Sequence, residues 1–290
     1  MIEAAFWSLV ASSSLLVGAA IALRYNLSQR TIGLVMGFGA GVLIAALSVD
    51  LALDAFGRAN GFVLALGLAA GGVTFFVGDL LLDRYGATHR KHSGGKQAEG
   101  GPLAIVLGIV LDGIPESAAI GVALIEGDGI GIAFVAAVFL SNLPESLSAT
   151  SGLRKAGRSP SWILGLWLLV SAVCAVAAML AFGLLDESQQ ALIAFTLAFA
   201  AGAILAMLAD TMMPEAFEHA GKTAALVTVL GFALGFLIIQ AGAEEHEGAP
   251  GVFRQPLQRG AALEAEDRAR LRSIPPWGRI PRGAERWFRL

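Results

Sequence analysis

The stretch LDGIPESAAIG, residues 111–121, places an aspartate, a proline and a glutamate close together inside an otherwise apolar run. The same Pro-Glu-Ser phrase returns in LSNLPESLSAT, residues 140–150. A carboxylate at the centre of a bilayer costs at least about 2.5 kcal/mol on insertion scales, so acidic residues in such runs usually serve a function. The two phrases therefore indicate a buried polar site between membrane helices.

Composition favours an integral membrane protein. The 290 residues are 56% hydrophobic and 15% charged, and the mean hydropathy is +0.70. A membrane-spanning helix needs about 20 apolar residues. We therefore expect an all-α, polytopic fold in residues 1–243 with eight transmembrane helices, followed by a disordered polar tail at residues 244–290. The expected helices are residues 4–23, 32–53, 61–82, 102–125, 130–152, 161–185, 189–214 and 223–243.

Lysine and arginine set the orientation, because cytoplasmic loops are enriched in both. The loops after the first, third and fifth expected helices carry Arg24 and Arg30, then Arg84, Arg90, Lys91 and Lys96, then Arg154, Lys155 and Arg158. These loops share one side, which predicts a multi-pass protein of the cell membrane with both termini outside the cytoplasm. The net charge of −3 gives no indication of a nucleic-acid partner.

The third loop, residues 84–101, is polar and glycine-rich and contains His89 and His92. We expect a solvated cytoplasmic linker. The alternative is a weak metal-collecting loop, because imidazole binds many transition metals.

An internal similarity relates the second and seventh expected helices. FGAGVLIAALSVDLALDAF from Phe38 matches FAAGAILAMLADTMMPEAF from Phe199 when the numbering is shifted by 161. The two helices cross in opposite directions, which predicts an inverted repeat of the kind found in secondary transporters. Short loops further predict that consecutive helices pack as antiparallel neighbours.

The chemistry of the two phrases points to a metal. Asp112 and Glu116 are four residues apart and share one helix face, and Ser141 and Asn142 precede Glu145 on the next helix. Antiparallel packing would bring the two faces together at mid-depth. These two helices contain no basic residue, so a bound divalent cation is the expected counter-charge.

The prolines add to this expectation. Pro115 and Pro144 each disturb the hydrogen bond to the residue four positions back, which frees the carbonyls of Leu111 and Leu140 and bends the helix. Broken helices near the midplane are where transporters bind ions. Kinked packing helices with protonated carboxyls are the alternative.

Other acidic residues fall in the apolar runs. The deeper ones, which could line a path for ions, are Asp50, Asp79 and Asp210. Those near helix ends, where we expect solvation at the interface, are Asp54, Asp83 and Glu215.

The helix number, the topology and the paired Pro115-Glu116 and Pro144-Glu145 phrases resemble the ZIP (Zrt/Irt-like) family of metal-ion transporters over residues 1–243. The resemblance implies metal ligands at Asp112, Glu116, Ser141, Asn142 and Glu145. It also places Asp112 where the family has histidine and Gly113 where it has asparagine. The sixth helix lacks the family's glutamate and offers only Cys174 nearby, which implies one metal position in place of two.

The resemblance implies a transporter that moves a divalent metal such as Zn²⁺, Mn²⁺ or Fe²⁺ into the cytoplasm, with no cofactor and no enzymatic activity, in a homodimer within the lipid bilayer. An intramembrane metal-dependent hydrolase and a transport-inactive, metal-sensing relative are the alternatives. The hydrolase is disfavoured because His89, His92, His219 and His246 all fall in expected loops or in the tail.

Overall fold

The computed structural model describes residues 1–86, 90, 92–95, 102–125 and 132–245. Its contacts divide the chain into one unit, Met1–Glu245, and a second, His246–Leu290. All but the first two residues of the expected tail, together with His89 and His246, lie outside the described residues. Every element in the described part is helical, which confirms the all-α prediction.

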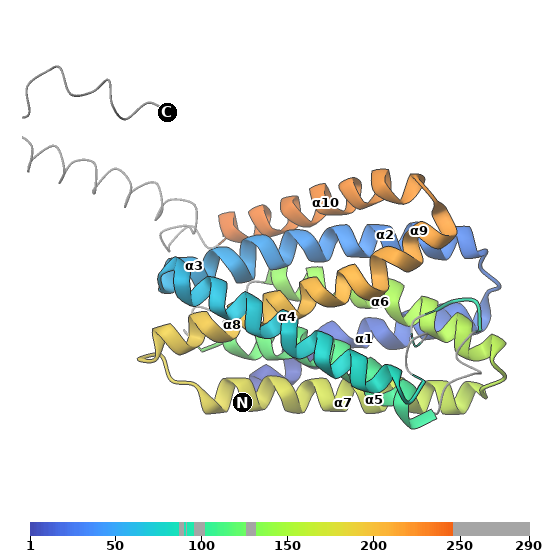
Figure 1. The fold of residues 1–290 in the computed structure, drawn as a ribbon, viewed down its shortest axis with the longest axis horizontal. Helices are drawn as coiled ribbons and strands as arrows, with labels where there is room; N and C mark the ends of the chain where they lie inside the picture. Colours follow the sequence, from blue (N-terminus) through green and yellow to red (C-terminus); the bar gives the residue numbers. More distant parts are fainter. Residues whose placement is uncertain (87–89, 91, 96–101, 126–131, 246–290) are drawn as a thin grey trace, which may run out of the picture. The chain divides into compact units, whose positions relative to one another are not determined.

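The first unit is built from eight long helical segments in its described part (Figure 1). They are α1 (Ile2–Arg24), α2 with η1 and α3 (Gln29–Ala46, Leu47–Leu53, Asp54–Arg58), α4 (Gly61–Asp83), α5 (Pro102–Ala123), α6 (Ile132–Lys155), α7 (Pro160–Leu184), α8 with η3 and α9 (Gln190–Met207, Leu208–Met212, Met213–Ala220), and α10 (Thr223–Glu245).

Seven of these described segments are long and apolar enough to cross a membrane. The remaining one, α6, is long enough at 24 residues but is rich in polar residues. Its serines and threonine at positions 141, 146, 148 and 150 are 0% exposed, so α6 is a polar helix enclosed by apolar ones. The chain is a multi-pass membrane protein.

Local signals explain where several helices begin. The Ser28 side chain accepts a hydrogen bond from the Thr31 amide at the start of α2. Asn60 accepts from the amides of Phe62 and Val63 at the start of α4. Such caps satisfy amides that the first helical turn leaves without partners.

The two halves depart from α-helical geometry at matching positions. Residues Leu47–Leu53 and Leu208–Met212 are π-helical, and their first residues differ by the same 161 positions that relate the two sequences. Single-turn π segments inside α-helices are rare and often mark functional sites. Their occurrence at equivalent places supports the predicted repeat.

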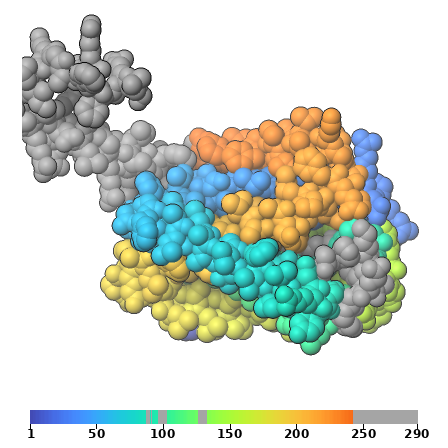
Figure 2. Space-filling model, in the orientation of Figure 1, coloured from blue at the N-terminus to red at the C-terminus, as the bar shows by residue number. Residues whose placement is uncertain are grey.

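Burial follows the same pairing. We compare an apolar stretch of 18 residues in each segment. In α2–η1–α3 and α8–η3–α9, 72% and 61% of that stretch are buried, against 17% in α4 and 22% in α10. The contacts place α10 along α2 and α4 along α8, and Figure 2 shows α4 and α10 at the surface. Each half therefore contributes one central helix and one peripheral helix that covers it.

Glycines allow this close approach. A Cβ atom on Gly41 of α2 would collide with the Thr228 carbonyl oxygen of α10, and one on Gly202 of α8 would collide with the Leu68 carbonyl oxygen of α4. Gly41 and Gly202 are themselves related by the repeat. Small residues serve this purpose widely in membrane helices.

The expectation that consecutive helices pack as neighbours was wrong for the helices that carry the Pro-Glu phrases. Helix α5 packs mainly against α7, and α6 packs mainly against α1 and α2, while direct contact between α5 and α6 is slight. The order of α5 and α6 in the chain therefore did not make them close neighbours. Packing follows the inverted repeat, which pairs helices distant in sequence.

Contacts bring four connections to one end of the bundle. Arg154 donates to the Leu23 carbonyl oxygen at 3.2 Å, Lys155 donates to the Ser93 carbonyl oxygen at 2.8 Å, and His92 lies 3.2 Å from Glu218. The connections after α1, α4, α6 and α9 therefore meet, as the alternation of spans requires.

Candidate metal site

All five predicted ligands are buried. Asp112 and Glu116 on α5 are each 2% exposed, and on α6 Ser141 is 0%, Asn142 7% and Glu145 5% exposed. Buried ionisable groups require a partner or a bound ion. We call this set, Asp112, Glu116, Ser141, Asn142 and Glu145, the carboxylate site.

Asp112 already has a counter-charge within the chain. Arg90 donates from Nε to Asp112 Oδ2 at 2.9 Å and from Nη2 to Asp112 Oδ1 at 3.0 Å. Its Nη1 lies 2.6 Å from Asp79 Oδ1 on α4. The sequence-based argument that the chain supplies no cation here was wrong for Asp112, because the cation comes from the connection between α4 and α5.

Arg90 is 1% exposed. Burial disfavours its charged form, but the carboxylates of Asp112 and Asp79 outweigh this effect and raise the pKa of the guanidinium above its ordinary value. Arg90 is therefore positively charged. Asp210 on η3 lies close to Asp79 and Arg90, so Asp79 and Asp210 belong to the same group of charges. Asp79 is buried as expected, whereas Asp210 is exposed, which corrects the expectation that it lies deep.

Cys174 on α7 packs against α5 at the carboxylate site. Its thiol is buried and lies within electrostatic reach of both Glu116 and Glu145. A Cβ atom on Gly113 would lie 2.9 Å from Cys174 Sγ. The glycine in the second position of the α5 phrase therefore makes room for the thiol against α5.

The prolines leave α5 and α6 helical throughout their described lengths, with Pro115 and Pro144 in their interiors. The departures from α-helical geometry occur instead in η1 and η3. No unwound segment therefore interrupts the described parts of α5 and α6 at the Pro-Glu phrases. Proline still withholds a donor from the carbonyl four residues earlier, and the bend at each proline stays a prediction.

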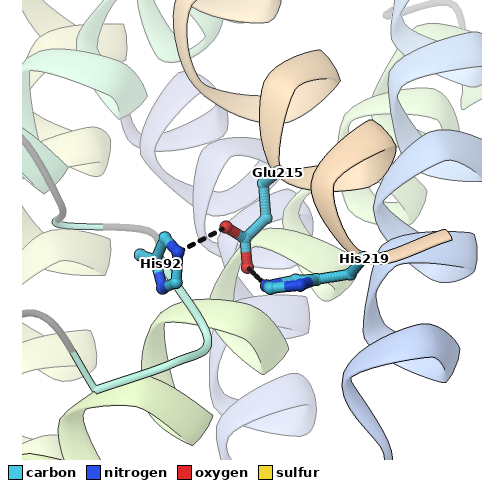
Figure 3. Close-up of side chains that lie close together, drawn as sticks. All are labelled: His92, Glu215 and His219. Carbon is cyan, nitrogen blue, oxygen red and sulfur yellow. Dashed lines mark ion pairs between the residues drawn. The ribbon is translucent and has the colours of Figure 1, made fainter. Parts of the chain in front are cut away.

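A second group of ligands lies in the described part of the chain at the end where the connections meet. His92, Glu215 and His219 each offer one ligand atom, and these atoms lie within 4.8 Å of one another. Figure 3 shows His92 from the α4–α5 connection pointing at the Glu215 carboxylate, with His219 one turn later on α9. We call these three residues the histidine cluster.

Glu215 is the centre of the histidine cluster. Its Oε1 lies 3.1 Å from His219 Nε2 and accepts hydrogen bonds from the Ser93 amide at 2.8 Å and the Ser148 hydroxyl at 3.1 Å. Its Oε2 lies 3.8 Å from His92 Nε2. Glu215 is 5% exposed, so the expectation that it is solvated at a helix end was wrong.

The ring of His92 has a defined proton position in this geometry. The Gly94 amide donates to His92 Nδ1 at 2.8 Å, so the ring proton lies on Nε2, which faces Glu215 and Glu218. A metal bound at Nε2 would replace that proton, and a metal-bound imidazole normally carries its proton on the other nitrogen. Metal binding would therefore require His92 to give up the Gly94 contact.

The α4–α5 connection is thus partly buried, which corrects the expectation of a solvated linker. Arg90, His92 and Ser93 are 1%, 9% and 0% exposed. One signal in the sequence could have revealed the histidine cluster. Glu215 and His219 are four residues apart, which places both on one face of a helix.

The fold and these sites define a polytopic helical membrane protein with carboxylate and imidazole side chains enclosed between its helices. Ionisable groups in this position mark ion pathways in pumps and transporters.

Comparison with known proteins identifies the family. A family model described as ZIP zinc transporter matches residues 83–243, more than half of the chain, and the chain belongs to that family. A protein of Arabidopsis thaliana with the description "Putative zinc transporter" is 25% identical over 222 residues, which are 76% of this chain and 35% of that relative. The chain spans about a third of the relative's length. The ZIP assignment made from the two Pro-Glu phrases is confirmed, and with it metal-ion transport at the level of the family.

Proposed function

We propose that the protein moves a divalent metal cation into the cytoplasm through the carboxylate site. The observation that carries this proposal is the burial of Asp112, Glu116, Ser141, Asn142 and Glu145 on α5 and α6, in a chain that belongs to the ZIP zinc transporter family. A dication in this position balances carboxylates that the membrane interior would otherwise disfavour.

The ligand chemistry bears on which metal is carried. Carboxylate, hydroxyl and amide oxygens suit Mn²⁺ or Fe²⁺ at least as well as Zn²⁺. The description of the Arabidopsis relative names zinc, and the nearby thiol of Cys174 offers a softer atom. We propose Zn²⁺, Mn²⁺ and Fe²⁺ as substrates, with one metal position at the carboxylate site because Gly113 has no side-chain ligand.

The basic connections support the proposed orientation in the membrane. Arg24, Arg154, Lys155 and Arg158 lie in or beside the connections after α1 and α6, and such residues favour the cytoplasmic side. We propose a protein of the cell membrane with both termini outside and with the histidine cluster at the cytoplasmic end. In that orientation the cluster would receive metal leaving the carboxylate site. The homodimer remains a proposal by family resemblance.

Two other functions are distinguishable by measurement. An intramembrane hydrolase would need a metal-held water and a general base, and a metal-sensing relative would bind metal without moving it. Metal flux into vesicles is expected only from a transporter. Hydrolysis without flux would support the first alternative, and binding without flux would support the second.

The test is uptake of ⁶⁵Zn²⁺ and ⁵⁴Mn²⁺ by proteoliposomes that contain the full chain. Glu116→Gln and Glu145→Gln keep side-chain volume but remove the charge, so either should abolish saturable uptake while membrane insertion is retained. Glu187→Gln is the matched control, because Glu187 is exposed in the α7–α8 connection and its uptake should equal that of the unmodified protein. Unchanged uptake in both Glu116→Gln and Glu145→Gln would overturn the proposed site.

A further inference from the structure

Arg90 is held as a buried, doubly paired cation. Its guanidinium places Nε and Nη2 on the two oxygens of Asp112 at 2.9 and 3.0 Å, and Nη1 on Asp79 at 2.6 Å. Two parallel N–H donors on one carboxylate form a strong and geometrically specific ion pair. Arg90 therefore connects α4 to α5 beside the carboxylate site.

This pairing conflicts with metal binding at Asp112. A carboxylate has about four lone-pair sites, and the guanidinium fork occupies one on each oxygen, along the edge where a metal would bind both oxygens. A dication bound there would also meet the positive charge of Arg90 at short range in a medium of low dielectric constant, where repulsion is strong. Asp112 cannot serve the guanidinium fork and a metal fully at the same time.

The surroundings give Arg90 a second position. Asp79 lies against its Nη1, and Asp210 lies close to both Asp79 and Arg90. If the guanidinium leaves Asp112, the carboxylates of Asp79 and Asp210 remain close to it as partners.

We infer that Arg90 is a tethered counter-cation that occupies Asp112 when the carboxylate site is empty and competes with the transported metal for that carboxylate. This inference rests on the proposed function, because it takes Asp112 as a ligand of the metal. Arg90 lowers the site's affinity for metal and so favours release. It also sets a threshold for entry, since an ion must attract Asp112 more strongly than a bidentate guanidinium does.

The chain replaces the family's histidine with aspartate at position 112, and the inference gives that substitution a consequence. A neutral imidazole would not hold a guanidinium in this way. It offers one uncharged acceptor nitrogen, whereas a carboxylate offers two charged oxygens to the two N–H donors of the fork. Asp112 and Arg90 therefore act as a matched pair, and the effect of changing Arg90 should depend on the presence of Asp112.

The test is equilibrium binding of Zn²⁺ and Mn²⁺ to the purified full chain in detergent. All variants carry His219→Ala, which removes one ligand of the histidine cluster so that binding reports on the carboxylate site. Arg90→Gln removes the competing charge and should tighten binding about tenfold or more. Arg90→Lys keeps the charge without the fork, so its metal affinity should lie between those of the background protein and Arg90→Gln. Arg90→Gln combined with Asp112→Asn should not bind metal more tightly than the background protein, because the carboxylate for which Arg90 and the metal compete is gone.

Thermal unfolding distinguishes this role from a purely structural ion pair. Arg90→Gln should unfold at a lower temperature without metal, because Asp112 and Asp79 lose their counter-charge, and added metal should raise its midpoint more than it raises that of the background protein. A structural pair would lower the midpoint and leave both the metal affinity and the metal-induced rise unchanged, which would overturn the inference. If Arg90→Gln does not fold, an affinity for Arg90→Lys equal to that of the background overturns it as well.

The outcomes separate this inference from the proposed function. Loss of binding in Glu116→Gln with unchanged affinity in Arg90→Gln would leave the carboxylate site standing and remove the role of Arg90. Absence of metal binding in both the background protein and Arg90→Gln would overturn both.

Discussion

At the scale of single residues, the histidine cluster makes a prediction separate from the carboxylate site. His219 lies one helical turn from Glu215, with Nε2 at 3.1 Å from the carboxylate. We expect His219→Ala to lower the amount of Zn²⁺ bound by the purified chain by about one ion. Imidazole binds Zn²⁺ well, and a site with only Glu215 and His92 remaining would have too few ligands.

The measurement is metal content per chain after gel filtration in buffer of fixed free Zn²⁺. Glu187→Gln, an exposed carboxylate outside both sites, should bind as much as the unmodified protein. Equal metal content in His219→Ala and the unmodified protein would show that hydrogen bonds and ion pairs hold the cluster together without a bound metal.

Residues differ in how far the sequence reveals their role. Glu116 and Glu145 could be predicted because a carboxylate stands out in an apolar run, and both are buried. The burial of Arg90 and His92 could not be predicted, because a polar residue in a polar connection gives no local sign of burial. Their partners are 22 and 126 residues away, at Asp112 and Glu218, and only the folded chain brings them together.

At the scale of helices, the repeat could be predicted because the spacing of small residues survives in both halves. The π segments could not, since they depend on how each central helix fits its neighbours. The adjacency of α5 and α6 was wrongly expected from their order in the chain. Their positions are set by α7 on one side and by α1 and α2 on the other.

The repeat predicts equal sensitivity at equivalent glycines. Gly41→Ala and Gly202→Ala each place a methyl group against a backbone carbonyl of the covering helix, and backbone moves less readily than a side chain. Both substitutions should lower the midpoint of thermal unfolding by several degrees, because overpacking a close helix contact costs about 1–3 kcal/mol.

Gly165 on α7 is the control. A Cβ atom there meets nothing within 4 Å, so Gly165→Ala should leave the midpoint unchanged or raise it, since alanine favours helix by up to about 1 kcal/mol. The midpoints of all three variants are measured by heating detergent-solubilised protein and monitoring the folded fraction by size-exclusion chromatography. A loss in only one of Gly41→Ala and Gly202→Ala would show that the halves pack differently.

At the scale of the whole molecule, the two ends of the bundle differ in chemistry. One end gathers Arg154, Lys155, His92 and Glu218. At the other end Arg58 is paired with Asp54 at 2.8 Å and donates to Gln190 at 3.2 Å. Lysine and arginine are thus more frequent at the first end, and this excess is the signal that marks the cytoplasmic side of membrane proteins.

This asymmetry predicts the accessibility of cysteines at the two ends. The background is Cys174→Ser, which removes the native thiol. Tyr25 is exposed in the connection after α1. Tyr25→Cys should therefore react with an impermeant maleimide only when the cytoplasmic face is open to the reagent. Glu187→Cys, exposed in the connection after α7, should react in intact cells. Both positions are exposed, so a lack of labelling reports the side of the membrane and not burial.

Labelling of Tyr25→Cys but not Glu187→Cys in intact cells would reverse the orientation and place the histidine cluster outside, where it would receive entering metal. Labelling of both would contradict the alternation of the spans between them.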